Sequence, residues 1–338
     1  MDAWVADLLA WYRSRERPMP WRGHPDPYAV WVSEIMLQQT QVETVRPYFT
    51  RFLAAFPDIP ALAAAADEPL LKAWEGLGYY TRVRNLRKAA QRLMAEHGGV
   101  LPRTVEGLRA LPGVGDYTAA AIASICFGQP VPVVDGNVAR VFARRNLLDG
   151  DFRKPAPRRA LAAWLTPHIA ASGDPAAFNQ AMMDLGAQVC VPRNPRCDAC
   201  PLRPTCLAAE QGRQADFPAP PPAKALPERT GAALLLRDAR GRLLLAKHPG
   251  DRLLAGFWEL PDPDALPFPK PKRTRRLGLY RQTFTHFRLT LEVRAAKPLP
   301  DSPALPEGFC WADDPAALPL TTAARKILAA HAASPPAH

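Results

Sequence analysis

The chain has no long apolar run. Residues 1–21, MDAWVADLLAWYRSRERPMPW, hold only a short apolar stretch that charges interrupt, so we expect neither a signal peptide nor a membrane span there. No lipidation signal or amphipathic basic anchor is found either. We therefore expect a cytoplasmic protein, associated with the nucleoid if its source is a bacterium.

Acidic residues are few beside basic ones. The chain has 32 Asp and Glu against 43 Lys and Arg, and its net charge is +11. This excess favours an anionic partner, with nucleic acid ahead of a membrane surface. At 338 residues the chain is long for a single core and sufficient for two domains.

Alternating strand patterns are absent from residues 1–209, where helical patterns dominate. Asp26 and Asp174, each followed by proline, are expected N-caps, and Thr40 with Glu43 has the spacing of a capping box. Helices are predicted over residues 2–14, 41–55, 68–75, 79–96, 116–127, 137–145, 157–170 and 175–186.

The composition changes after residue 209. The proline-rich residues 210–229 predict an interdomain linker. Beyond it, two strands about a tight turn in residues 231–248, a strand pair in residues 278–296 and a last helix near 321–330 predict an α+β domain over residues 230–338. The chain is therefore predicted to be multidomain, all-α first and α+β second.

Cysteine is scarce outside one short segment. Cys126 and Cys310 stand alone, whereas the other four of the six have the spacing C-x6-C-x2-C-x5-C: Cys190, Cys197, Cys200 and Cys206. In a reducing compartment this crowding favours a metal site over a disulfide framework, and either a [4Fe-4S] cluster or a structural zinc ion suits four thiolates. The uneven single loop resembles the cluster loop of the endonuclease III and MutY family of DNA glycosylases, which implies a [4Fe-4S] cluster.

The turn LPGVG, residues 111–115, resembles the helix-hairpin-helix turn of that family. Glycines there let the backbone approach a phosphate, and the first N–H groups of the next helix bind the anion without reading sequence. We expect Leu111, Gly113 and Gly115 to form this DNA contact and Asp116 to cap the helix. Asp135, in VVDGNVARV, stands where glycosylases of this superfamily carry an aspartate.

Glu34 is the second candidate carboxylate. Its helical neighbours Val30, Trp31 and Leu37 are apolar, and desolvation raises the pKa of a carboxyl and favours a general acid. The segments SEIMLQQTQV, GLGYYTRVRNLRKAA and FNQAMMDLGAQVC resemble the MutY family more closely than endonuclease III, and with the C-terminal domain the resemblance covers nearly the whole chain. It implies a six-helix barrel at about 22–130 and a cluster subdomain from residues 1–21 and 131–209.

The resemblance also implies an activity: removal of adenine mispaired with 8-oxoguanine or guanine in duplex DNA by a monomeric enzyme that flips the base out. Glu34 would protonate N7, and Asp135 would stabilise the oxocarbenium sugar, either as a charge or through a transient covalent bond. Asn137 would orient the catalytic carboxylate and Tyr117 would close the pocket. Endonuclease III carries a Schiff-base lysine where Tyr117 stands, so we expect a monofunctional glycosylase without efficient β-lyase activity.

Further contacts follow from the same matching. Arg22 and Asp184 would contact the flipped adenine. Gln39 and Thr40 would contact the lesion or its neighbours, and Leu77 and Tyr79 would insert into the duplex. The C-terminal domain resembles the Nudix fold of MutT but lacks the glutamate-rich box that holds magnesium. Its loop TFTHF matches the family's 8-oxoguanine contact, with Thr285, where many relatives have serine, between Phe284 and His286.

Three alternatives remain at this point. One is a bifunctional pyrimidine-damage enzyme like endonuclease III, which Tyr117 and the extra C-terminal domain disfavour. Another is a noncatalytic iron–sulfur protein that binds DNA or senses redox state, which would not need Glu34 and Asp135 for base release. A Nudix hydrolase is the third, and the missing box speaks against it.

Overall fold

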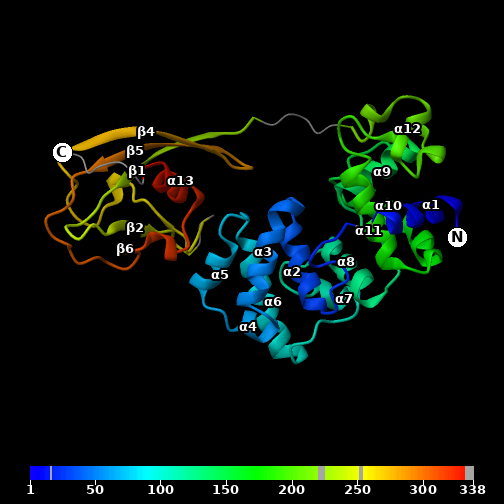
Figure 1. Ribbon diagram of the computed structural model, residues 1–338, viewed down its shortest axis with the longest axis horizontal. Coiled ribbons are helices and arrows are strands. Elements are labelled where there is room, and N and C mark those ends of the chain that lie inside the picture. The colour runs from blue at the N-terminus through cyan, green and yellow to red at the C-terminus, as the bar shows by residue number, and fades with distance from the viewer. Residues whose placement is uncertain (16, 220–224, 251–253, 332–338) are drawn as a thin grey trace. The chain divides into compact units, whose positions relative to one another are not determined.

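The computed structural model describes residues 1–15, 17–219, 225–250 and 254–331 (Figure 1). The chain divides into two compact units, one made of Met1–Ala64 with Arg84–Pro222 and the other of Ala65–Val83 with Ala223–His338. Residues 220–224 of the expected linker lie outside the described residues. Within the described ranges no helix is both long enough and apolar enough to cross a membrane.

The first unit is helical, and the predicted helices are confirmed to within two residues at each end. The helices of residues 1–210 are α1 (Ala3–Ser14), α2 (Pro27–Leu37), α3 (Val42–Ala55), α4 (Ile59–Ala63), α5 (Asp67–Trp74), α6 (Thr81–His97), α7 (Val105–Arg109), α8 (Asp116–Phe127), α9 (Gly136–Asn146), α10 (Pro155–Ser172), α11 (Pro175–Gln188) and α12 (Leu207–Glu210). Of these, α5 belongs to the second unit, and α6 crosses the boundary.

Helix starts follow the expected capping only in part. The carboxylates of Asp26 and Asp174 accept from the backbone N–H groups of Tyr28 and Ala177, so both predicted N-caps are confirmed. The predicted capping box is wrong, because the N-cap of α3 is Gln41, which makes no side-chain cap bond.

Close helix packing positions the site in the first unit. Helix α11 contacts α1, α8 and α9, and α2 contacts α8, an arrangement that Figure 1 also shows. A Cβ at Gly186 would lie 2.6 Å from the Cβ of Asn137, so only glycine lets α11 approach the start of α9 this closely. The buried core of α1, α9, α10 and α11 includes Leu8, Phe142 and Phe178.

The second unit contains two small sheets and α13 (Thr322–His331). One sheet has the order β1 (Glu228–Leu235), β5 (Arg288–Ala296), β4 (Thr274–Thr283), and the other has β3 (Trp258–Glu259), β2 (Leu243–Lys247), β6 (Phe309–Ala312). The strand pair β4–β5 and the last helix are confirmed. The strands β1 and β2 are also present, but they belong to different sheets, with β1 parallel to β5. Both ends of the expected linker are structured, since Glu210 ends α12 and Glu228 begins β1.

Candidate active site

Glu34 is buried in the middle of α2, with 5% of its surface exposed. Burial raises the pKa of its carboxyl to about 7, and the negative charge of Asp135 adds to this, whereas a hydrogen bond from Tyr117 and the charge of Arg22 act to lower it. Its Oε2 has no hydrogen-bond partner among the described residues. The predicted apolar environment is therefore confirmed, and a substantial fraction of Glu34 is protonated at neutral pH.

Asp135 is the N-cap of α9. Its Oδ1 accepts from the backbone N–H of Val138 at 2.7 Å, and its Oδ2 accepts from Nδ2 of Asn137 at 2.9 Å. Burial raises the pKa of Asp135, while these hydrogen bonds and the charge of Arg140 lower it. Both oxygens are thus held by donors at a helix N-terminus, a geometry that favours the ionised form.

A chain of hydrogen bonds runs from Asp135 to the cysteine loop through Asn137 and Arg140. The Arg140 guanidinium donates from Nη2 to Oδ1 of Asn137 at 2.8 Å and from Nε to the carbonyl of Cys190 at 2.8 Å. A third bond reaches the carbonyl of Gly186 at 2.9 Å. The predicted orienting contact of Asn137 on Asp135 is present. Arg140 was not predicted, and only its position three residues after Asn137 on one helix face could have indicated it.

The hairpin turn leads directly into this site. Gly113 has φ 78°, and a Cβ there would lie 2.7 Å from the Cβ of Asn85, whereas a Cβ at Gly115 would meet nothing within 4 Å. Gly115 is the N-cap of α8 and offers no side-chain cap, so the predicted cap at Asp116 is wrong; that side chain pairs with Arg109 instead. Leu111 is buried. The start of α8 therefore presents backbone N–H groups and an open glycine, as an anion site requires.

Tyr117 lies in the first turn of α8. Its side chain packs against the buried cluster of Ala120, Ala121 and Val133, and its hydroxyl lies 3.3 Å from Sδ of Met183. Burial and the charges of Glu34 and Asp135 raise the pKa of the phenol well above its ordinary value. Tyr117 is therefore a neutral hydrogen-bond donor beside both carboxyls.

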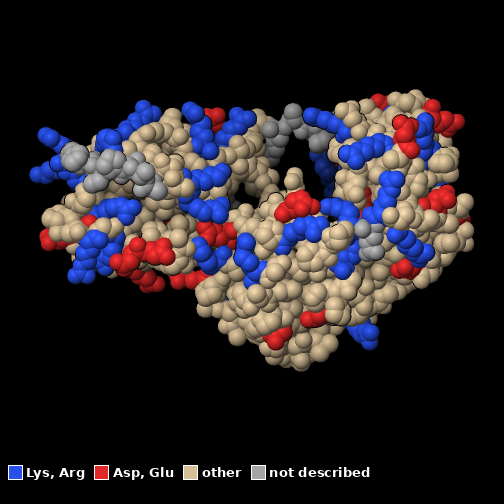
Figure 2. Space-filling view, in the orientation of Figure 1, with Lys and Arg blue, Asp and Glu red and all other residues tan. Residues whose placement is uncertain are grey.

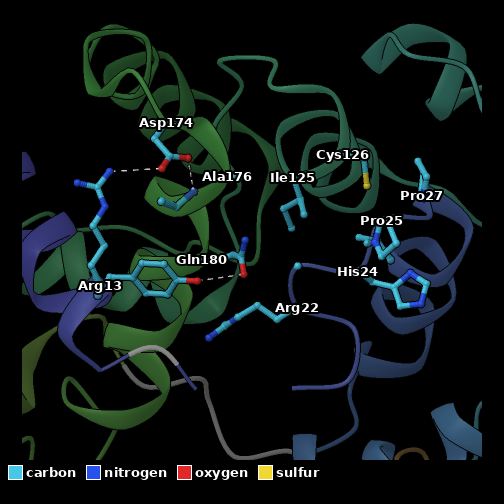
Figure 3. A pocket seen from close by; sticks show the side chains of 14 residues that line it. Arg13, Arg22, His24, Pro25, Pro27, Ile125, Cys126, Asp174, Ala176 and Gln180 are labelled. Atoms are coloured by element: carbon cyan, nitrogen blue, oxygen red, sulfur yellow. Dashed lines mark hydrogen bonds and ion pairs between the residues drawn. The ribbon is translucent and has the colours of Figure 1, made fainter. Parts of the chain in front are cut away.

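Arg22 and Asp184 form a buried ion pair, Nη1 to Oδ2 at 2.9 Å, with side chains 9% and 8% exposed. Asp184 is thus not a solvated helix charge. Arg22 also lines a pocket of about 420 Å³ with Tyr12, His24 and Gln180. The Tyr12 hydroxyl donates to Oε1 of Gln180 at 3.2 Å, and Figure 3 shows Gln180, Arg22 and Cys126 among the side chains that line the pocket. The charge of Arg22 also lowers the pKa of Glu34, although the residues that line the pocket include neither Glu34 nor Asp135.

The four clustered cysteines line one small cavity, together with Arg144 and Gln214. Arg144 is 3% exposed and donates to the carbonyls of Val191 and Pro192 and to Sγ of Cys190, at 2.7, 2.8 and 3.4 Å. Across the described ranges no three His, Cys, Asp or Glu side chains are grouped to hold a single metal ion. Sequence reasoning missed Arg144, because no motif marks a helical arginine that binds the carbonyls of a distant loop.

The expected lesion contacts lie in two loops of the second unit and in the turn after α2. Gln39 is exposed with φ 57°, and Thr40 donates to the carbonyl of Gln38 at 3.4 Å. Leu77 is buried, whereas Tyr79 is 42% exposed. The β4–β5 loop exposes Thr285 and His286, while the Phe284 and Phe287 rings stack with centroids 4.5 Å apart.

Known proteins resemble both parts of the chain. Residues 32–167 match the model of the HhH-GPD superfamily of base excision DNA repair proteins, and residues 232–330 match that of the NUDIX domain. The human adenine DNA glycosylase is 35% identical over 87% of this chain and 66% of its own length. The mouse adenine DNA glycosylase is 35% identical over 92% of this chain and 74% of its own length. The chain belongs to the adenine DNA glycosylase family.

Solved structures match the helical part of this adenine DNA glycosylase family member. A thermostable thymine-DNA glycosylase superposes with a TM-score of 0.55 at 28% identity, covering 61% of this chain and 95% of its own. An endonuclease III bound to DNA gives a TM-score of 0.54 at 22% identity, covering 62% and 94%, and shows the fold alone. The predicted helix-hairpin-helix glycosylase fold and the Nudix-like domain are both confirmed.

This adenine DNA glycosylase family member also carries a basic surface on its C-terminal unit. Figure 2 shows Lys and Arg side chains gathered over β4 and β5. The exposed members are Lys272, Arg273, Arg275, Arg276, Arg281 and Arg288. Arg275 and Arg276 lie on β4 and not in an irregular loop. Positive charge on and beside a regular strand suits contact with the phosphates of a nucleic acid.

Proposed function

We propose that this protein removes adenine mispaired with 8-oxoguanine or guanine in duplex DNA, as a step of base excision repair. We further propose that it acts as a monomer in the cytoplasm, on the nucleoid of a bacterium. One observation carries the proposal: a single site pairs Glu34, whose pKa is raised to about 7, with Asp135, whose two oxygens are hydrogen-bonded. Acid-assisted cleavage of a glycosidic bond requires one carboxyl that stays protonated as the acid and a second that stays ionised to stabilise the positive charge.

In this proposal Glu34 donates its proton to N7 of the flipped adenine. The C1′–N9 bond then breaks, its electron pair leaves with the base, and C1′ carries the positive charge of an oxocarbenium ion. Asp135, held by Asn137 and the Val138 amide, stabilises that charge. Water adds to C1′ and loses a proton, which leaves an abasic site.

We propose that the enzyme stops at the abasic site. A Schiff base needs an amine, and the hairpin position next to both carboxyls carries the phenol of Tyr117. Its raised pKa keeps the hydroxyl protonated. Tyr117 would donate a hydrogen bond to Glu34 and close the pocket without attacking the sugar.

The proposed recognition contacts divide between the base and its partner. The buried pair of Arg22 and Asp184 would border the flipped adenine, and Arg22 also lines a pocket of about 420 Å³. The partner 8-oxoguanine is assigned to Gln39, Thr40, Phe284, Thr285 and His286. Leu77 and Tyr79 are the proposed inserting side chains, and the 42% exposure of Tyr79 supports its part in this.

We propose that Cys190, Cys197, Cys200 and Cys206 hold a [4Fe-4S] cluster. The four cysteines line one small cavity, and four thiolates can hold such a cluster. The cluster would fix the loop against α9 through Arg144. The purified protein should be brown and contain about four iron atoms and four sulfides per chain, whereas a colourless protein with one zinc ion would refute this assignment.

A single-turnover assay tests the activity. Duplexes with adenine opposite 8-oxoguanine, guanine or thymine are incubated with excess protein, and alkali then reveals abasic sites. We expect adenine release opposite 8-oxoguanine and guanine, with strand cleavage only after alkali. No release opposite 8-oxoguanine would overturn the proposal, and a stoichiometric adduct trapped by borohydride would overturn its monofunctional part.

A further inference from the structure

The segment Ala65–Val83 belongs to the same compact unit as the C-terminal domain. In the chain it lies inside residues 32–167, the part that matches the glycosylase superfamily. It contains α5 and the turn with Leu77 and Tyr79. The segment therefore packs with the C-terminal domain, although it lies within the glycosylase part of the sequence.

Glu68 on α5 makes the polar part of these contacts. Its Oε1 accepts from Nζ of Lys247 on β2 at 2.8 Å and from Nε1 of Trp258 on β3 at 3.2 Å. The hydrogen bond from Lys247 lowers the pKa of Glu68. The Lys247 ammonium also lies 5.1 Å from the Trp258 ring centroid. One carboxylate thus joins α5 to two strands of the β3-β2-β6 sheet.

Two more contacts extend the attachment along the segment. Nζ of Lys72 donates to the carbonyl of Leu318 at 3.1 Å. The rings of Tyr80 and Phe257 lie with centroids 4.0 Å apart, and both are buried. The segment is therefore held by the C-terminal domain on both sides of its turn.

The turn itself has an unfavourable backbone. Tyr79 has φ 48°, a left-handed conformation that a residue with a side chain rarely adopts and that needs support from its surroundings. Arg82 is 9% exposed and donates to the carbonyls of Leu77 and Gly78, each at 3.1 Å. At the tip, the Tyr79 hydroxyl lies 2.6 Å from Oγ1 of Thr285 in the β4–β5 loop.

We infer that Glu68 is a positioning residue through which the C-terminal domain holds the Tyr79 turn, so that Tyr79 and Thr285 meet the base opposite the adenine as one preformed unit. The inference rests on the proposed function, and it concerns recognition of the opposite base and not cleavage. A turn that is already ordered loses less conformational entropy when it binds. Loosening it weakens discrimination between 8-oxoguanine and guanine, while the carboxyl site in the other unit keeps its chemistry.

The test compares Glu68→Ala with Glu68→Gln, which keeps an acceptor oxygen for Lys247 and Trp258. Glu96→Ala is the matched control, because Glu96 forms a similarly exposed ion pair with Arg92 at 2.8 Å. Single-turnover rates are measured at subsaturating and saturating protein on adenine opposite 8-oxoguanine and opposite guanine. We expect Glu68→Ala to lower the preference for 8-oxoguanine about fivefold, the effect of an exposed ion pair with one further hydrogen bond. Glu68→Gln should restore part of it, and the saturated rate opposite 8-oxoguanine should stay within about twofold.

A second readout needs no base release. A duplex with 2-aminopurine beside 8-oxoguanine and a non-cleavable 2′-fluoroadenosine opposite the lesion reports insertion of the turn by its fluorescence, and the same titration gives Kd. Glu68→Ala should reduce the fluorescence change, and the Glu96→Ala control should not. An unchanged preference and an unchanged signal would overturn the inference, as would an equal loss on both mispairs. If the wild type releases no adenine, the proposed activity fails, and this binding readout still decides the role of Glu68.

Discussion

The carboxyl pair of the first unit and the Tyr79–Thr285 pair of the second unit are built in opposite ways. Glu34 is 5% exposed and the pKa of its carboxyl is raised to about 7. Tyr79 is 42% exposed, and its hydroxyl meets that of Thr285 at the surface. The first site buries its carboxyl groups away from water, and the second exposes hydroxyl groups at the protein surface.

The difference follows from the two tasks proposed for these sites. Proton transfer to a base requires a carboxyl that stays protonated near neutral pH, and burial is the physical means of raising its pKa. Reading the opposite base requires groups that reach the duplex, so they must stay exposed and be ordered by something else. Changes in the first site should therefore alter rate and stability, and changes in the second should alter preference.

The largest expected effect is on base release. Glu34→Gln removes the proton donor while keeping the shape of the side chain, and we expect the single-turnover rate to fall about a thousandfold. In the wild type the rate should decline as the pH rises above about 7, since Glu34 ionises there. Binding of the lesion should be retained, because the residues proposed to contact it are not part of the buried carboxyl site. A rate that is flat from about pH 6 to 9 would contradict the role of Glu34 as the acid.

The same substitution should stabilise the protein. The pKa of Glu34 is raised from 4.5 to about 7 in the fold, so the wild type loses stability as the pH rises between these values, and the glutamine variant does not. We expect Glu34→Gln to be more stable by about 3 kcal/mol at pH 8 and by about 1 kcal/mol at pH 5. Urea unfolding at both pH values measures the difference, and a gain that is the same at both would show that burial of the charge is not its cause.

The carboxyl site was largely predictable from sequence. The apolar neighbours of Glu34 indicate a raised pKa for its carboxyl, whereas Asp135 was identified from the family resemblance and its place as the N-cap of α9 was not predicted. Arg140 and Arg144 were missed because a helical arginine looks the same in sequence whether it faces water or buried carbonyls. The capping errors at Thr40 and Asp116 have a similar origin, since one residue of shift in a tight turn moves the cap to Gln41 or Gly115.

The grouping of the second unit was beyond sequence reasoning. The strands β1, β2, β4 and β5 and the last helix have local patterns and were predicted, whereas the short strands β3 and β6 were not. The attachment of residues 65–83 to the C-terminal domain depends on single long-range contacts, such as that between Glu68 and Lys247. Such contacts produce no periodic pattern in the sequence. Pairing of β1 with β5 is likewise long-range, whereas the predicted tight turn before β2 is confirmed by an antiparallel bridge between Arg237 and Leu243.

A smaller effect is expected at the hydroxyl pair. Tyr79→Phe and Thr285→Val each remove one partner of the 2.6 Å hydrogen bond with little change in shape. We expect each to lower the preference for 8-oxoguanine over guanine by roughly fivefold, and the double variant to lose little more, since a net hydrogen bond contributes about 1 kcal/mol and is lost once. Single-turnover rates on both mispairs measure this cycle. Strictly additive losses would mean that the two hydroxyls act separately.

The smallest effect is expected at the basic surface of β4. Arg276 and Arg281 are exposed on that strand, and neutralising both as Arg276→Gln and Arg281→Gln removes at most two phosphate contacts. The slope of log Kd for undamaged duplex against log salt should therefore fall by about 2 at most. Preference between 8-oxoguanine and guanine should stay as in the wild type, because phosphate contacts carry no base information. A change in that preference would mean that these arginines take part in recognition of the opposite base and do not only bind phosphates.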